Sequence, residues 1–258
     1  MSPTKTTVPI DPVKPLTLAP GEIQFFQKYG FLVIPGLLTE NAVTPLHDEV
    51  MEVMQLIGLA MDKLKQTTEY LAGRRVDALV NSPQLRQVAT QLLGGPSSLY
   101  LPFTAVKGTG GGRFHFHQDN QYTRLDGPAL NLWTALTPMS PENGCLQIVP
   151  GSHLNGTLDS IESGDGDEHR KVPMEPDDFL PVRLRPGDCV VFTRLTVHGS
   201  GPNLLPIPRV AYAVQFHRDD VNWLDRKTGQ WKSLKQFPPR SLTPVQSLRT
   251  PTSKTDGH

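Results

Sequence analysis

The run HFHQD at residues 115–119 constrains this chain most, because it places two metal-ligand side chains two residues apart. Side chains alternate between the two faces of an extended strand, so His117 and Asp119 point the same way and can bind one ion. A third ligand has to come from elsewhere, and the best candidate is His198, far downstream. Two histidines and one carboxylate form the facial triad typical of non-haem Fe(II) oxygenases, which leaves coordination positions open. We therefore expect two distant strands to meet at one metal site.

Each candidate ligand also has a second interpretation. His117 and Asp119 would fit an ordinary histidine–carboxylate hydrogen bond on a strand. His115 shares the strand face of His117, so an H-x-H pair of the kind found in cupin-like barrels is an alternative, but it leaves Asp119 without a role. An isolated His198 would also fit a turn cap. The polar residues that follow His198 favour metal binding over these alternatives.

The candidate ligands belong to a longer ordered set of motifs. Between them lies a segment at residues 133–153 that ends in the letters PGSH, and His198 is followed by Ser200 and Arg209. A bare H-x-D motif occurs by chance in many proteins, whereas this ordered set is specific. Over residues 18–217 the chain resembles the phytanoyl-CoA dioxygenase-like branch of the Fe(II)/2-oxoglutarate-dependent oxygenases.

The resemblance implies an activity and its cofactors. It assigns His117, Asp119 and His198 as the Fe(II) ligands and catalytic residues, with 2-oxoglutarate and O₂ as co-substrates. The reaction it implies is hydroxylation of an unactivated C–H bond of a small-molecule substrate, with release of succinate and CO₂. Desaturation, epoxidation and ring closure are alternative outcomes. Related halogenases lack the carboxylate ligand so that halide can bind, and Asp119 therefore argues against halogenation.

Five further residues are candidates for binding 2-oxoglutarate, in roles that the resemblance implies. Arginines are usually exposed, but Arg209 lies in an apolar, strand-like run, and its planar fork suits the distal carboxylate. Ser200 can donate a hydroxyl hydrogen bond to the same carboxylate. Trp133 fits equally well as a core residue and as a wall of this pocket. Thr104 and Lys107 precede the metal strand and are candidates for the other end of the co-substrate, although such residues are also common on strand surfaces.

The candidates for substrate contact are Gln121, Tyr122 and Arg124, which follow the metal strand. Their chemistry fits polar small molecules, amino-acid derivatives and acyl conjugates alike. Phe114 stands three positions before the first metal histidine, where several family members have a polar residue. Residues 154–179 contain a glycine-rich, acidic middle, and long loops of this kind are usually lids, binding loops or disordered inserts. We expect this loop to be a lid.

Two functions from other classes also fit a metal-binding jelly roll. The first is a metal-binding or sensing module without turnover. The second is a cupin-like zinc or manganese hydrolase or isomerase. Neither explains why Ser200 and Arg209 follow the third candidate ligand. Oxygen uptake with iron and 2-oxoglutarate would separate the three hypotheses.

Three helices are expected before the strands begin. Apolar residues recur at intervals of three and four, and glycines stand at the expected ends. For the second helix we expect Thr44 as the N-cap, with Pro45 at the first helical position, while Thr39 is the competing start. The expected helices cover residues 20–29, 43–64 and 82–93.

Short strands punctuated by glycine and proline follow the helices. This pattern predicts an α+β protein that is mainly β, a double-stranded β-helix (jelly roll) with the N-terminal helices packed on one sheet. A short strand at residues 31–34 precedes the second helix. The later strands are expected at residues 98–106, 113–119, 129–136, 145–149, 180–184, 188–193, 196–198 and 209–217.

The chain is expected to form one catalytic domain, at residues 18–240. Residues 1–17 contain several prolines, which remove backbone donors and predict an extended or disordered arm. Trp223, Trp231 and Phe237 predict that the first part of the segment after His217 docks, whereas residues 241–258 are expected to be a mobile tail.

Composition bounds the partners and the compartment. Lysine plus arginine total 25, and aspartate plus glutamate also total 25. This balance does not favour nucleic acid or an anionic membrane as a partner, so a small-molecule substrate is expected. Cys145 and Cys189 lie in apolar segments, which favours buried free thiols and a reducing compartment. No apolar run has the length of a signal peptide core or a membrane span, and we expect a soluble, cytoplasmic protein.

Overall fold

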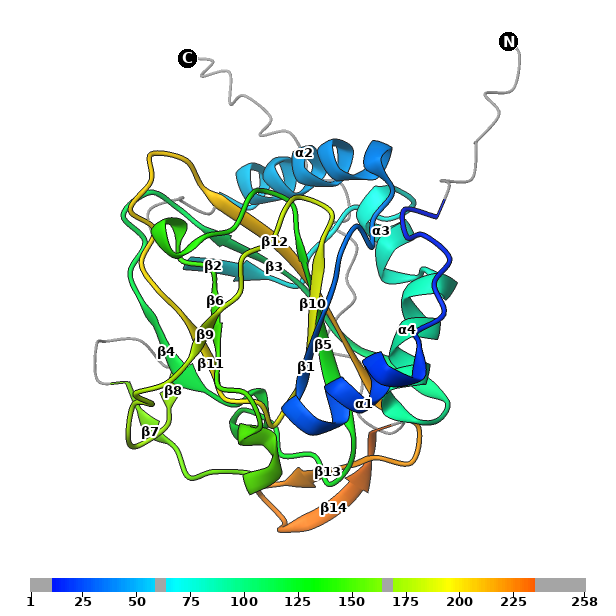
Figure 1. Ribbon diagram of the computed structural model, residues 1–258, viewed down its shortest axis with the longest axis vertical. Coiled ribbons are helices and arrows are strands. Elements are labelled where there is room, and N and C mark those ends of the chain that lie inside the picture. The colour runs from blue at the N-terminus through cyan, green and yellow to red at the C-terminus, as the bar shows by residue number, and fades with distance from the viewer. Residues whose placement is uncertain (1–10, 59–63, 164–168, 235–258) are drawn as a thin grey trace, which may run out of the picture.

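Two β-sheets pack face to face in the computed structural model, which describes residues 11–58, 64–163 and 169–234 (Figure 1). The larger sheet has the strand order β1-β10-β5-β12-β3-β2, and the smaller sheet has the order β4-β11-β6-β9. All neighbouring strands are antiparallel, and most neighbours are distant in sequence, as in a jelly roll. The expected fold is confirmed. The larger sheet consists of β1 Phe31–Ile34, β10 Cys189–Thr193, β5 Ala129–Ala135, β12 Arg209–Arg218, β3 Ser97–Lys107 and β2 Leu64–Thr67. The smaller sheet consists of β4 Phe114–His117, β11 His198–Ser200, β6 Leu146–Ile148 and β9 Leu180–Pro181.

In the described part of the chain, four helices lie on the outer side of the larger sheet and form a separate layer (Figure 1). Their apolar faces share one core with side chains of this sheet. The third expected helix is present with Ser82 as its N-cap, whose hydroxyl accepts a hydrogen bond from Leu85 N at 3.1 Å. The four helices are α1 Pro20–Tyr29, α2 Glu40–Leu56, α3 Arg75–Val80 and α4 Pro83–Leu93.

Strand β12 separates two cores because its side chains alternate between the faces of the sheet. Val210, Tyr212 and Val214 are buried in the core shared with the helices. Ala211 and Ala213 belong to the core between the two sheets. Large side chains therefore face the helices and small ones face the interior of the jelly roll. The face of the small residues is the one that carries the site.

Helix α2 begins earlier than expected. Its N-cap is Thr39, not Thr44, and Pro45 lies inside the second turn. The N-terminal segment fixes this start, because Thr39 N donates to Pro12 O at 2.9 Å. Pro45 removes one helical hydrogen bond, which the packed helix tolerates. A tertiary contact has overridden the local preference for proline at the first helical position.

The same helix also ends earlier than expected. It stops at Leu56, and Gly58 follows in the left-handed region with φ 68°. Leu64 begins strand β2 instead and pairs with Lys107 of β3. Met61, the other residue expected on this helix, lies outside the described residues. The apolar spacing continued past the true end because an edge strand supplies the next apolar residue.

Helix α3 was not expected, and its start depends on a residue from another helix. Glu49 of α2 is 2% exposed, and its carboxylate accepts hydrogen bonds from Arg75 N at 2.9 Å and Val76 N at 3.3 Å. These are free donors of the first helical turn, which attract a negative charge. Burial raises the pKa of Glu49, since it penalises the charged form.

Each of the eight expected later strands overlaps a strand of the structure, with two differences in extent. The strand expected at residues 180–184 is only β9, and residue Leu184 forms an isolated bridge to Met139. The strand expected at residues 196–198 is β11, which starts at its last residue. Strand β9 makes two pairs with β6, Leu180 with Ile148 and Pro181 with Gln147.

The expected loop, and the segment that follows the jelly roll, contain structure in their described parts. Two short strands, β7 Ile161–Glu162 and β8 Arg170–Lys171, pair within the loop, and residues 164–168 lie outside the described residues. After the jelly roll, β13 Asn222–Asp225 and β14 Gln230–Ser233 form a hairpin that docks through Trp223. Residues 1–10 and the expected tail also lie outside the described part. No described helix has the length and apolar character needed to cross a membrane.

We predict that Glu49→Ala lowers the free energy of unfolding by about 1–3 kcal/mol, because two backbone donors lose their acceptor. Urea unfolding followed by circular dichroism measures this change. The matched control is Glu52→Ala, whose carboxylate pairs with Arg74 at 2.7 Å with both side chains over 40% exposed. Its expected effect is below about 1 kcal/mol. Equal losses in the two variants would contradict the capping role of Glu49.

Candidate metal centre

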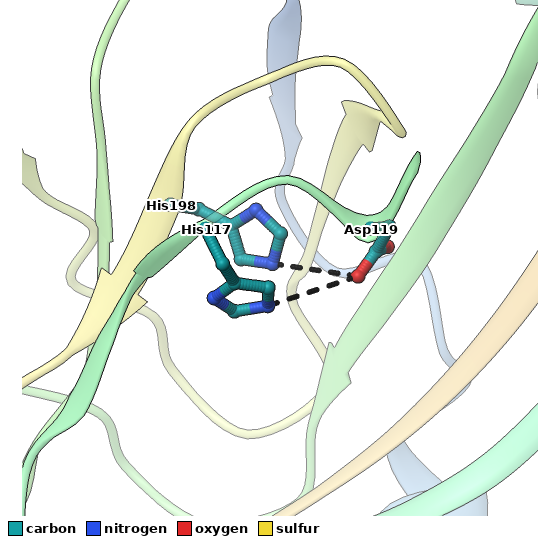
Figure 2. A group of neighbouring side chains, drawn as sticks. All are labelled: His117, Asp119 and His198. Carbon is teal, nitrogen blue, oxygen red and sulfur yellow. Dashed lines mark ion pairs between the residues drawn. The ribbon is translucent and has the colours of Figure 1, made fainter. Parts of the chain in front are cut away.

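Three candidate ligands meet inside the jelly roll, at one end of the smaller sheet (Figure 2). His117 is the last residue of β4, and His198 is the first residue of β11, directly opposite it in the strand pairing. Asp119 begins a 3₁₀ turn, η1 Asp119–Gln121, immediately after β4. Ligand atoms of the three side chains lie within 4.8 Å of one another. Strand pairing thus brings together residues that are distant in sequence.

The expected strand geometry holds for only part of the H-x-D motif. Strand β4 ends at His117, so Asp119 lies on a turn and not on the strand. Gln118 keeps an extended backbone, with φ −114° and ψ 137°, and this keeps the two ligands on one side. His115 is not part of the group, because its Nδ1 lies 3.0 Å from Glu175 Oε1. The alternative H-x-H pair is therefore not formed.

The hydrogen bonds of both histidines leave the same ring nitrogen free for a metal. His117 Nδ1 lies 2.9 Å from His115 O, and His198 Nδ1 lies 2.9 Å from Thr196 O. A carbonyl only accepts hydrogen bonds, so Nδ1 carries the proton in each ring and Nε2 carries the lone pair. The two Nε2 atoms lie 3.9 Å and 3.7 Å from Asp119 Oδ1 (Figure 2). This donor set fits a divalent metal of the iron type.

Burial keeps His117 in the form that binds metal. Removal from water, together with the charge of His198, lowers the pKa of His117 to about 3. The neutral imidazole is therefore present throughout the physiological range. Proton release does not have to precede metal binding at this residue.

Two buried cations lie side by side on the interior face of the larger sheet. Arg209 of β12 and Lys107 of β3 are opposite each other in the strand pairing, and neither is exposed to solvent. Arg209 NH1 donates to Gly144 O at 2.5 Å, while its Nε and NH2 have no hydrogen-bond partner. Gly144 has φ 73° and a side chain there would collide with Gly201 O, so only glycine fits this turn.

Lys107 donates hydrogen bonds at the end of strand β11, the strand that carries His198. Its Nζ donates to Ser200 Oγ at 2.8 Å and to Gly201 O. Burial and the neighbouring Arg209 lower the pKa of Lys107 to about 6, and burial lowers the pKa of Arg209 to about 10. Among the described residues no carboxylate pairs with either cation. Buried charges are costly without a partner, so an anion beside these two side chains would stabilise them.

The remaining candidates for the co-substrate pocket lie on opposite faces of the sheet. The Trp133 ring lies 5.3 Å from the Arg209 guanidinium and also belongs to the core between the two sheets, so its role as a pocket wall stays a prediction. Lys107 lies next to Arg209, whereas it was predicted to bind the opposite end of 2-oxoglutarate. Thr104 pairs with Tyr212, whose side chain faces the helices, and Thr104 shares that face. Because side chains alternate along β3, Thr104 points away from Lys107 and Arg209.

A cavity of about 500 Å³ opens beside the candidate metal ligands. Tyr122, a predicted substrate residue, lines it, and its ring centre lies 5.7 Å from the ring centre of His117. Phe114 also lines it and contacts the His117 ring edge-on, with ring centres 4.7 Å apart. The cavity lining comprises Gln66, Thr67, Thr68, Glu69, Tyr100, Leu101, Phe103, Phe114, His117, Asp119, Tyr122, Thr123, His169, Arg194 and Gln215.

The other two predicted substrate residues lie away from this cavity. Gln121 is 3% exposed, and its amide donates to Leu158 O and Asp159 O, which fastens the following loop. Arg124 lines a second cavity of about 490 Å³ on another side of the protein. The 3₁₀ turn that begins at Asp119 changes the direction of the chain, so Gln121 points away from the cavity that Tyr122 lines.

Several residues around the ligands were not among the predicted site residues. Gln215 and Asn131 donate to Asp119 Oδ2, at 3.0 Å and 3.4 Å. Arg194 and His169 line the cavity. The sequence contained a signal for Gln215. It lies an even number of residues after Arg209 on a predicted strand, so the two side chains are expected on the same face of that strand.

Comparisons with known proteins agree with this geometry. The family model of phytanoyl-CoA dioxygenase (PhyH) matches residues 26–211. Phytanoyl-CoA dioxygenase 1 of Oryza sativa subsp. japonica is 36% identical over 129 residues, which cover 45% of this chain and 45% of the rice protein. Methylphosphonate hydroxylase of Gimesia maris is 28% identical over 208 residues, 75% of this chain and 78% of that protein.

A solved structure shares the same architecture. The crystal structure of SnoK, described as a non-heme alpha ketoglutarate dependent carbocyclase from nogalamycin biosynthesis, superposes with a TM-score of 0.65 at 26% identity. The match covers 80% of this chain and 86% of SnoK. The expected resemblance is confirmed: the family model matches most of the chain, and the chain belongs to the phytanoyl-CoA dioxygenase (PhyH) family.

Proposed function

We propose that this protein is an Fe(II)- and 2-oxoglutarate-dependent dioxygenase that hydroxylates an unactivated C–H bond of a small molecule, releasing succinate and CO₂. One observation carries the proposal. Two histidine Nε2 atoms and one carboxylate oxygen converge in the same interior that holds two buried basic side chains, with which no carboxylate of the described residues pairs. A metal module without turnover, or a zinc hydrolase, would not need this cation pair.

The residues of this chain divide the work between metal and co-substrate. His117, Asp119 and His198 would hold Fe(II), which when bound supplies the activation of O₂ that oxidises 2-oxoglutarate. A facial ligand set leaves its remaining positions on one side. Arg209 would bind the distal carboxylate of 2-oxoglutarate through Nε and NH2, the two atoms that lack partners. Ser200 Oγ accepts a hydrogen bond from Lys107 Nζ, so its own hydroxyl proton would be left to donate to the same carboxylate.

The cavity supports a small organic substrate. Tyr122, Phe114 and Phe103 give it aromatic walls, and Glu69 and Thr123 add polar groups. Contact between Tyr122 and the substrate stays part of the proposal. Mass analysis of the product distinguishes hydroxylation, which adds oxygen, from ring closure or desaturation, which remove hydrogen. The relative SnoK is described as a carbocyclase, so this measurement is essential.

A cytoplasmic location is also proposed. Cys145 and Cys189 are both free and buried, which is usual for proteins of a reducing compartment. Fractionation of the native cells with an antibody against the protein would test it.

We predict that Asp119→Ala and His198→Ala each abolish succinate formation from 2-oxoglutarate, because a facial triad that lacks one ligand no longer holds Fe(II) in place. Circular dichroism should show an unchanged fold. The control is His47→Ala on the surface of α2, which should retain turnover. Undiminished succinate formation in both ligand variants would overturn the metal assignment.

We predict that Arg209→Ala weakens 2-oxoglutarate binding about thirtyfold to a few thousandfold, the equivalent of about 2–5 kcal/mol for one side of a buried charged pair. Arg209→Lys should give an intermediate loss, since it keeps the charge without the fork. Anaerobic calorimetry on the Fe(II)-loaded protein measures both. Fe(II) affinity should not change, and Arg183→Ala, with a 65% exposed side chain, is the control. Wild-type affinity in Arg209→Ala would refute the role.

We predict that 2-oxoglutarate binding takes up a proton at Lys107 Nζ near neutral pH. The folded pKa of Lys107 is lowered to about 6, so the amine is mostly neutral above that pH, and a bound carboxylate favours the charged form. Affinity should therefore be highest below about pH 6 and fall by up to about tenfold per unit as the pH rises. Calorimetry in buffers of different ionisation enthalpy detects the uptake. Lys107→Met should abolish it, and buffer-independent heats in the wild type would contradict it.

A further inference from the structure

We infer that Gln215, aimed by Arg194, is a positioning residue that holds one oxygen of Asp119 and so makes it a one-oxygen metal ligand. The inference rests on the metal site of the proposed function and adds residues that are not themselves ligands. It begins with two amides on the interior face. Gln215 of β12 lies opposite Asn131 of β5 in the strand pairing, and both are almost fully buried.

Both amides point at the same oxygen of the carboxylate. Gln215 Nε2 donates to Asp119 Oδ2 at 3.0 Å, and Asn131 Nδ2 lies 3.4 Å from it. The other oxygen, Oδ1, is the one that faces the two histidine Nε2 atoms. The shorter contact makes Gln215 the main donor of the pair. Asp119 thus has one oxygen for the protein and one oxygen for the metal.

Arg194 determines which way the Gln215 amide faces. Arg194 NH1 donates to Gln215 Oε1 at 2.5 Å. A guanidinium carries only donors and a carboxylate only accepts, so the amide oxygen has to face Arg194 and the amide nitrogen has to face Asp119. The reversed amide would set two oxygens against each other and a donor against a cation. The three side chains therefore fix one another in a single orientation.

Arg194 also holds the backbone of the ligand. Its NH2 donates to Asp119 O at 2.8 Å and to Thr123 O at 3.1 Å. The Tyr100 ring lies 4.9 Å from the guanidinium, and Arg194 is 4% exposed. Asp119 lies on a turn, without the ladder of hydrogen bonds that holds the histidines on their strands. Arg194 and Gln215 replace that ladder, one at the main chain and one at the side chain.

The arrangement has a consequence for the number of open metal positions. A carboxylate that binds with both oxygens occupies one more position than a carboxylate that binds with one. A keto acid that chelates with two atoms and O₂ together need three positions, which a facial triad of single-atom ligands provides. Holding Oδ2 on Gln215 prevents Asp119 from taking one of them. Groups that orient ligands in this way typically change metal affinity by about 10–100-fold when removed.

The test uses Gln215→Met and Gln215→Leu, which replace the amide donor with an apolar side chain of similar size. Fe(II) affinity is measured anaerobically by competition with a chelator, without turnover, and 2-oxoglutarate affinity is then measured at saturating Fe(II). We expect about 10–100-fold weaker Fe(II) binding. We also expect weaker 2-oxoglutarate binding, although Gln215 is remote from Arg209 on the strand. The thermal midpoint of the metal-free protein should change little in the methionine variant.

The matched control is Tyr212→Phe, which removes one partnerless hydroxyl from the opposite face of the same strand. Both affinities should stay at the wild-type level in it. Arg194→Lys should fall between wild type and Gln215→Met, because an ammonium can reach Oε1 of Gln215 but not Asp119 O at the same time. The double variant Arg194→Lys with Gln215→Met should lose less than the sum of the two single losses, since Arg194 acts partly through Gln215.

The outcomes separate the positioning role from the proposed function. If the wild type binds Fe(II) and both Gln215 variants bind it within twofold of the wild type, the positioning role is overturned and the metal site stands. A lowered thermal midpoint with unchanged affinities would assign Gln215 a purely structural role and also overturn it. If the wild type itself does not bind Fe(II), both inferences fail together.

Discussion

The alternation of side chains along β12 is the constraint on which the rest of the structure depends. One face of this strand packs against the helices through Val210, Tyr212 and Val214, and the other carries Arg209 and Gln215 into the interior. A slip of one residue in the strand pairing would exchange these faces completely. The valines would then face the interior, and the arginine would be buried against the helices without a partner. Packing of the helical layer therefore enforces the geometry of the site.

Short-range patterns in the sequence were enough to predict the parts of the site that strands present in a fixed way. The spacing of His117 and Asp119 predicts a shared face. The later motif, through its resemblance to a known family, predicts His198 as the third ligand, and the role of Arg209 stays a prediction. Strand pairing then does what the pattern requires, since His198 lies directly opposite His117. The jelly roll followed from the punctuation of the strands, and the helical layer from its apolar spacing. These signals are local and periodic, so a single sequence reveals them.

The features that escaped prediction depend on contacts between distant residues. Helix α3 starts where Glu49 caps it, and α2 starts where Pro12 binds Thr39. Thr104 has the polar character of a pocket residue, but its place in the alternation turns it toward the helices. The turn after Asp119 likewise takes Gln121 away from the cavity. In each case a tertiary contact or a change of backbone direction decides the outcome, and neither is written in residue type or spacing.

The cation pair of Arg209 and Lys107 links the stability of this protein to its chemical surroundings. Charging both side chains in this buried site is costly, since burial lowers both pKa values and leaves Lys107 mostly neutral above about pH 6. An anion that binds the folded chain and not the unfolded one raises the free energy of unfolding by RT ln(1 + [L]/Kd). The lifetime of the folded chain in a cell would then follow the concentration of that anion. The abundance of the protein would then depend on the supply of the metabolite that it binds.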